Sequence, residues 1–84
     1  MPETRLFLAT FQIVDEIGFF NAALRLGHKR PPGMRLHHWY ISADGATSHA
    51  IWEATDAHAL MGVLDVEFGE SAAYVLGEVN VLYG

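Results

Sequence analysis

The residues best suited to chemistry in this sequence occupy alternate positions in two adjacent segments, and they are His38, Tyr40, His49 and Glu53. The dipeptide Asp44-Gly45 lies between the two segments. It is a strong signal for a tight β-hairpin, because the turn needs positive φ angles that aspartate and glycine tolerate. We therefore expect residues 35–42 and 47–54 to form two paired strands.

A hairpin centred on Asp44-Gly45 fixes which residues face each other. The predicted pairs are Tyr40 with His49, His38 with Ile51, and Leu36 with Glu53. Because side chains alternate between the two faces of a strand, all six project from the same face. Glu53 and His49 are then the diagonal neighbours of His38, at roughly 7–8 Å, which is within reach of one shared ligand.

This group supports three interpretations, and the first is acid–base catalysis on a small polar substrate. Glu53 orients the His38 imidazole, and Tyr40 donates a proton in an isomerisation or a cyclisation. This chemistry requires no cofactor. The other three members of the group then contact the substrate, namely His49, Leu36 and Ile51.

The second interpretation is a divalent metal site formed by His38, His49 and Glu53, since two imidazoles and a carboxylate suit zinc, nickel or non-haem iron. His37 is left out, because the neighbour of His38 in a regular strand points to the opposite face. The third interpretation is a purely structural assembly module in which these residues are satisfied polar groups. The residues themselves leave the three alternatives open.

The opposite face of the hairpin is aromatic and apolar. It receives Arg35, His37, Trp39 and Ile41 from one strand, and Ser48, Ala50, Trp52 and Ala54 from the other. We expect the face with Trp39 and Trp52 to be the contact between subunits. A polar cluster on a covered sheet requires a cavity, water or a ligand. We therefore expect the face with His38 and Glu53 to line a pocket under the helices.

The flanking segments predict the remaining elements. A short apolar run at residues 6–13 is typical of a buried strand. A helix follows the N-cap Asp15 and ends near Gly27, with one apolar face made of Ile17, Phe20 and Leu24. A second helix follows Asp56 and ends at Gly69, with a buried side made of Leu60, Met61, Leu64 and Phe68. The last strand is expected over residues 73–83.

The predicted order is βαββαβ, which defines an α+β domain with a four-stranded antiparallel sheet and two helices on one face. We expect the first and last strands to lie in the middle of this sheet. Two helices on one face leave the other face bare, and a second copy of the chain would cover it.

Composition points to a homodimer or a higher homo-oligomer. The 84 residues make a single domain over 1–84, which buries only a modest core. The chain is 51% hydrophobic and 12% aromatic, contains no cysteine, and so needs another apolar surface rather than disulfides. A net charge of −5 argues against nucleic acid as a partner. No apolar run is long enough for a membrane span, and a cytoplasmic location is the default expectation.

The sequence resembles a known superfamily over about residues 31–56. The resemblance rests on Pro32-Gly33 before the second strand, Ala43-Asp44-Gly45 at the turn, and Ile51-Trp52-Glu53-Ala54 at the end of the third strand. These motifs are similar to those of small proteins in the dimeric α+β barrel superfamily, which has the ferredoxin-like arrangement.

The resemblance implies a homodimer with facing sheets and a pocket between each sheet and its own helices. The superfamily includes muconolactone-isomerase-like enzymes, cofactor-free monooxygenases, polyketide cyclases and a small nickel-binding type, so the resemblance does not select one activity. It carries over most directly to Glu53, within the Trp-Glu-Ala motif, and then to His38. His49 stands where the superfamily would have an apolar residue.

Overall fold

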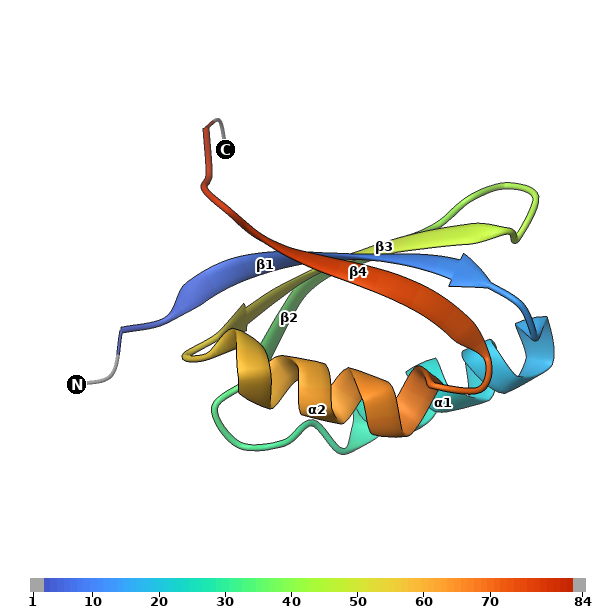
Figure 1. Ribbon diagram of the computed structural model, residues 1–84, viewed down its shortest axis with the longest axis horizontal. Coiled ribbons are helices and arrows are strands. Elements are labelled where there is room, and N and C mark those ends of the chain that lie inside the picture. The colour runs from blue at the N-terminus through green and yellow to red at the C-terminus, as the bar shows by residue number, and fades with distance from the viewer. Residues whose placement is uncertain (1–2, 83–84) are drawn as a thin grey trace.

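The computed structural model describes residues 3–82 and confirms the predicted order of elements (Figure 1). The strands and helices are β1 (Arg5–Ile13), α1 (Glu16–His28), β2 (Arg35–Ile41), β3 (Thr47–Ala54), α2 (Ala57–Phe68) and β4 (Ala72–Val79). The predicted last strand therefore ends earlier than expected, and Tyr83 lies outside the described residues. Neither helix within residues 3–82 is long and apolar enough to cross a membrane.

The sheet has the strand order β2-β3-β1-β4, and all neighbouring strands are antiparallel. The prediction that the first and last strands are central is half wrong, because β4 is an edge strand and β3 is central. The reason is the width of a helix. A helix of about 10 Å spans two strand spacings, so each crossover returns to the sheet two positions away. The two crossovers interleave, which leaves β1 and β3 inside.

Both helices lie on one side of the sheet, and no element lies over the other side in the part of the chain that the structure describes (Figure 1). Below, the two sides are called the helix face and the open face. The helix face of the two central strands is formed by Phe7, Ala9, Phe11, Ser48, Ala50, Trp52 and Ala54, all of them buried. The predicted alternation of side chains within β3 is confirmed.

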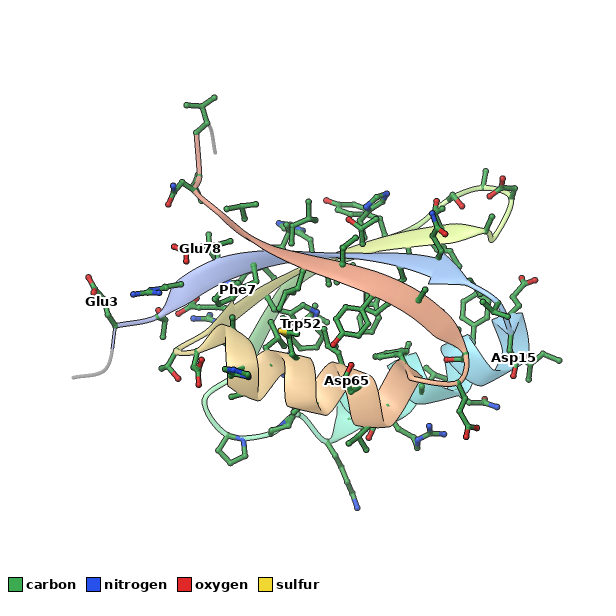
Figure 2. All side chains as sticks on the ribbon, viewed as in Figure 1. Glu3, Phe7, Asp15, Trp52, Asp65 and Glu78 are labelled. Atoms are coloured by element: carbon green, nitrogen blue, oxygen red, sulfur yellow. The ribbon has the colours of Figure 1, made fainter. Side chains whose placement is uncertain are left out.

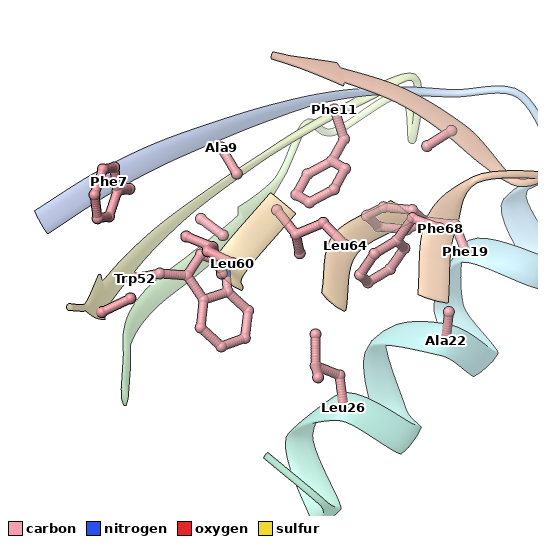
Figure 3. Close-up of a cluster of buried hydrophobic side chains, with 13 residues drawn as sticks. Phe7, Ala9, Phe11, Phe19, Ala22, Leu26, Trp52, Leu60, Leu64 and Phe68 are labelled. Atoms are coloured by element: carbon pink, nitrogen blue, oxygen red, sulfur yellow. The ribbon is translucent and has the colours of Figure 1, made fainter. Parts of the chain in front are cut away.

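The core between sheet and helices is dominated by aromatic rings (Figure 3). Phe11 lies at its centre, with ring centroids 5.3 Å from Phe19 of α1 and 5.0 Å from Phe68 of α2. Trp39 of β2 stacks on Phe11 at 6.0 Å. Offset and edge-to-face pairs of this kind contribute about 0.5–1.5 kcal/mol beyond the burial of their area.

The assignment of the two faces is therefore the reverse of the prediction. Trp52 is 0% exposed and Trp39 packs against the core, so this side faces the helices rather than a second subunit. Trp52 and Phe7 point from the sheet toward the helices, while other side chains project from the uncovered surface (Figure 2). Close packing of the helices requires a sheet face on which small residues leave room for the large aromatic rings. The alanines at 9, 50 and 54 give the rings that space.

Helix α1 also buries a different stripe from the one predicted. Its buried residues are Phe19, Ala22 and Leu26, whereas Ile17 and Leu24 are 76% and 62% exposed. Both stripes have helical spacing, so periodicity alone does not separate them. The small Ala22 lets the helix approach the core closely. The N-cap is as predicted, since Asp15 accepts a hydrogen bond from the Gly18 amide at 3.2 Å.

Helix α2 has the predicted buried side in its main part. Leu60, Leu64 and Phe68 are 0% exposed, and only Met61 differs, with 40% of its surface exposed. Its N-cap is Asp56, whose carboxylate accepts from the His58 amide at 2.9 Å.

The adjacent phenylalanines of α1 provide a matched test of this packing. Phe19 is 2% exposed and Phe20 is 43% exposed, so the same truncation should have different costs. We expect Phe19→Ala to lower the free energy of unfolding by about 3–5 kcal/mol, as for other buried phenylalanines. Phe20→Ala should cost less than half as much. Urea denaturation at a single protein concentration measures both, and equal costs would contradict the assignment of the buried stripe.

Candidate functional site

The hairpin register is as predicted near the turn and departs from the prediction farther along. Tyr40 pairs with His49, and His38 pairs with Ile51. A β-bulge then lies between Leu36 and His38. In this step of the ladder, β2 contributes two residues and β3 contributes only one. His37 is the extra residue of this bulge.

The bulge removes Leu36 from the predicted group of site residues. Leu36 pairs with Trp52 instead of Glu53, and it packs against the core on the helix face. Arg35 takes the place opposite Glu53. Leu36 is therefore separated by the sheet from the residues with which it was predicted to bind a substrate. The cause is the single added residue, which reverses the alternation of every residue before it.

The bulge also brings His37 to Glu53. The Nε2 atom of His37 lies 2.8 Å from Oε1 of Glu53, and the Thr4 hydroxyl donates to Oε2 at 2.6 Å. The histidine that hydrogen-bonds to Glu53 is thus His37, whereas His38 keeps its predicted place opposite Ile51, diagonal to Glu53. Neither His37 nor Thr4 was among the predicted site residues. The one sequence signal was that His37 and His38 are adjacent. A regular strand would place these two side chains on opposite faces, which is why His37 was not predicted to lie near Glu53.

Glu53 is held as a carboxylate by these two neighbours. The hydrogen bond from Thr4, and then the one with His37, lower the pKa of the Glu53 carboxyl below its usual value. Both carboxylate oxygens have partners, so the group is oriented as well as ionised. A carboxylate bonded to one imidazole nitrogen fixes the ring and leaves the other nitrogen free to exchange a proton.

The other predicted residues lie beside this pair on the open face. His38 and Tyr40 stack with ring centroids 5.9 Å apart and an interplanar angle of 13°. Tyr40 is 61% exposed, and its partner across the ladder, His49, is also exposed. Ile51 lies between them and Glu53 along β3 and is half-buried. These residues are accessible from solvent in a single chain, and the predicted location under the helices is wrong.

The rest of the open face is largely apolar. The register places Leu8 opposite Ile51, Thr10 opposite Val75, and Leu6 opposite Val79. Polar groups from β2 and β3 thus form one side of the face, and the residues of β1 and β4 on the remainder are mostly aliphatic, apart from Thr10 and Gln12.

The predicted metal ligands are not gathered into a metal site within one chain. Among residues 3–82, no group of three or more histidine, cysteine, aspartate or glutamate side chains could hold a metal ion. His38, His49 and Glu53 share a face, but the two histidines lie beside Tyr40, whereas Glu53 is hydrogen-bonded to His37 and Thr4. The metal interpretation stays a prediction.

A second polar pair lies between α2 and β4 and has a structural role. The Tyr74 hydroxyl lies 2.6 Å from Oδ1 of Asp65 and 3.1 Å from the Met61 carbonyl oxygen. Burial, with the Asp65 carboxylate beside it, raises the pKa of Tyr74 to about 12, so the phenol remains protonated. This contact joins the last helix to the last strand.

The element order and the open four-stranded sheet define the chain as a small α+β domain with ferredoxin-like topology. Comparison with known proteins adds no relative, since no family model, curated protein or solved structure matches the chain.

The hydrogen bond from Thr4 can be tested by titration. We expect Thr4→Val, which keeps the side-chain shape, to raise the pKa of Glu53 toward its usual value. Carbon-13 NMR of the Glu53 carboxyl measures this directly. Thr10→Val is the control, because Thr10 lies on the same face of β1 without contact to Glu53. If Thr4→Val and Thr10→Val leave the same pKa, Thr4 is not the cause.

The same pKa shift sets the sign of a pH effect on stability. Because the Glu53 pKa is lower in the folded chain than in the unfolded chain, the ionised form stabilises the fold. This contribution is present above the ordinary glutamate pKa and is lost as the pH falls through the folded value. Thr4→Val should therefore reduce the acid dependence of unfolding.

Proposed function

We propose that this chain is a homodimer of the dimeric α+β barrel type that binds a small polar molecule between its two open faces. The observation that carries the proposal is the His37–Glu53–Thr4 group at the polar end of an uncovered sheet face. His38, Tyr40 and His49 complete the polar surface beside it. The aliphatic side of the same face supplies the contact with the second chain.

The open face favours a second copy for a physical reason. Leu6, Leu8, Ile51, Val75 and Val79 share it, and Val75 is 70% exposed. Burial of apolar surface is worth roughly 25 cal/mol for each Å², so leaving these side chains in water has a cost that a second sheet removes. The helix face has no such need, because its aromatic residues are already packed within the chain.

The chemistry that this site supports best is proton transfer without a cofactor. Glu53 orients the His37 ring through their hydrogen bond, while the free ring nitrogen accepts or donates a proton at the substrate. The stacked His38 and Tyr40 and the exposed His49 offer further hydrogen-bond donors to a small polar substrate. Isomerisation and cyclisation need no more than this, and both remain part of the proposal.

The dimer can be tested with two matched valine substitutions. Val75 lies on the open face and is 70% exposed, and Val66 lies on α2 and is 83% exposed. We expect Val75→Asp to raise the dimer dissociation constant at least about tenfold for each substituted subunit, which corresponds to about 1.4 kcal/mol of binding free energy per subunit. Val66→Asp should leave the dissociation constant unchanged. Sedimentation equilibrium measures both. A wild-type chain that is monomeric at micromolar concentration would contradict the proposal.

Ligand binding can be tested with a panel of small polar fragments observed by NMR. We expect binders to shift the ring signals of His37, His38 and His49, and Glu53→Gln to weaken their binding at least about tenfold, since a charged hydrogen-bond partner is lost. Glu78→Gln is the matched control on the helix-face side of β4. Elemental analysis of untagged protein accompanies the screen. One equivalent of metal for each chain would favour the metal interpretation over proton transfer.

A further inference from the structure

The segment after β4 is apolar and projects away from the domain. β4 ends at Val79, and beyond it Val81 and Leu82 are 70% and 97% exposed. Figure 1 shows this C-terminal segment leaving the sheet on the side opposite the helices. Two aliphatic side chains in water at the end of a strand gain nothing from their own chain. They lie on the side where the proposed second subunit would be.

A small apolar pocket lies at the opposite corner of the sheet. It has a volume of about 170 Å³ and lies between α1 and the edge strand β2, where Phe20, Ala23, Trp39 and Ile41 form most of its wall. This volume is below the roughly 300–1,000 Å³ of pockets for drug-sized ligands, so it suits one side chain.

The polar atoms near this pocket already have partners. Trp39 donates its indole N–H to the Ser48 hydroxyl at 2.8 Å, and Ser48 donates to the Tyr40 carbonyl oxygen at 2.6 Å. A ligand in the pocket would therefore find few free hydrogen-bonding groups. Ile41 and Phe20 are 41% and 43% exposed at its rim. The expected occupant is aliphatic.

The sheet face alone is small for a stable dimer. Four strands of about eight residues cover roughly 19 by 26 Å, or about 500 Å² on each subunit. A standard stable interface buries about 800 Å² on each side. Two buried aliphatic side chains bring about 100 Å² each, and the surface they cover on the other subunit adds a similar amount. Engagement of the segment after β4 would raise the interface to the standard size.

Geometry allows this engagement in a symmetric dimer. Val79 and Ile41 lie at diagonally opposite corners, because Val79 pairs with Leu6 at one end of the sheet and Ile41 pairs with Ser48 at the other. A two-fold axis between the sheets, perpendicular to this diagonal, brings each corner over the other. Three extended residues span about 10 Å, which equals the usual distance between packed sheets and brings the arm to the plane of the second sheet. The Leu82 side chain then turns around the β2 edge to the helix face, where the pocket lies.

We propose that residues 80–82 of each subunit form an arm that inserts Leu82 into the pocket between α1 and β2 of a second copy. This inference rests on the proposed dimer and adds the element that closes it. The contact is reciprocal, so each dimer contains two arms and two occupied pockets. The arm passes the β2 edge of the second copy and shields that strand from other chains.

A cysteine pair provides the direct test, because the chain has no cysteine of its own. We expect the double variant Ile41→Cys/Leu82→Cys to form a covalent dimer on mild oxidation, and peptide mass mapping to find a disulfide that joins positions 41 and 82 of different chains. The control is Val66→Cys/Leu82→Cys, whose second position lies on the outer side of α2. It should give no 66–82 disulfide. A 41–82 disulfide within one chain would overturn the inference.

A second measurement separates the arm from the dimer itself. Leu82→Asp should raise the dimer dissociation constant about a hundredfold, tenfold for each of the two sites, while Val66→Asp should not change it. A wild-type monomer would overturn both the proposed dimer and the arm. A wild-type dimer that Leu82→Asp leaves intact, with no disulfide between positions 41 and 82, would overturn the arm and leave the dimer standing.

Discussion

The packing of Phe11 between Phe19 and Phe68 determines how every other part of this domain is placed. These three rings come from the central strand and from both helices, and their centroids lie 5.0–5.3 Å apart. Once Phe11 faces the helices, the alternation of side chains assigns each residue of β1 to a face, and the ladders transmit that choice to the other strands. The proposed site is on the open face because these rings are on the other.

The sequence predicted the elements well, because their signals are local. N-caps at Asp15 and Asp56 and the turn at Asp44-Gly45 depend on neighbouring residues only. The register beside the turn was correct for the same reason. What could not be predicted was the choice between two faces that both carry aromatic residues. Trp39 and Tyr40 are adjacent in the sequence, and only the packing of the helices decides which of the two side chains faces the core.

The candidate site was predicted in part, and the bulge explains the difference. Alternation from the turn correctly placed His38, Tyr40, His49 and Ile51 on one face, but it failed beyond His37. A bulge has no reliable sequence signal, since it depends on the balance between lost ladder hydrogen bonds and a contact such as that of His37 with Glu53. The same local irregularity thus removed Leu36 from the site and added a histidine to it.

The central position of β1 also has a consequence for the order in which the chain can fold. β1 pairs along nearly its whole length with both β3 and β4, and β4 begins only at Ala72. During synthesis, the first strand therefore emerges long before the last of its partners exists. Such non-local pairing slows folding, because distant segments must meet before their contacts are formed. Until then, the hydrophobic residues of β1 depend on early contacts with α1 and the β2–β3 hairpin to avoid aggregation.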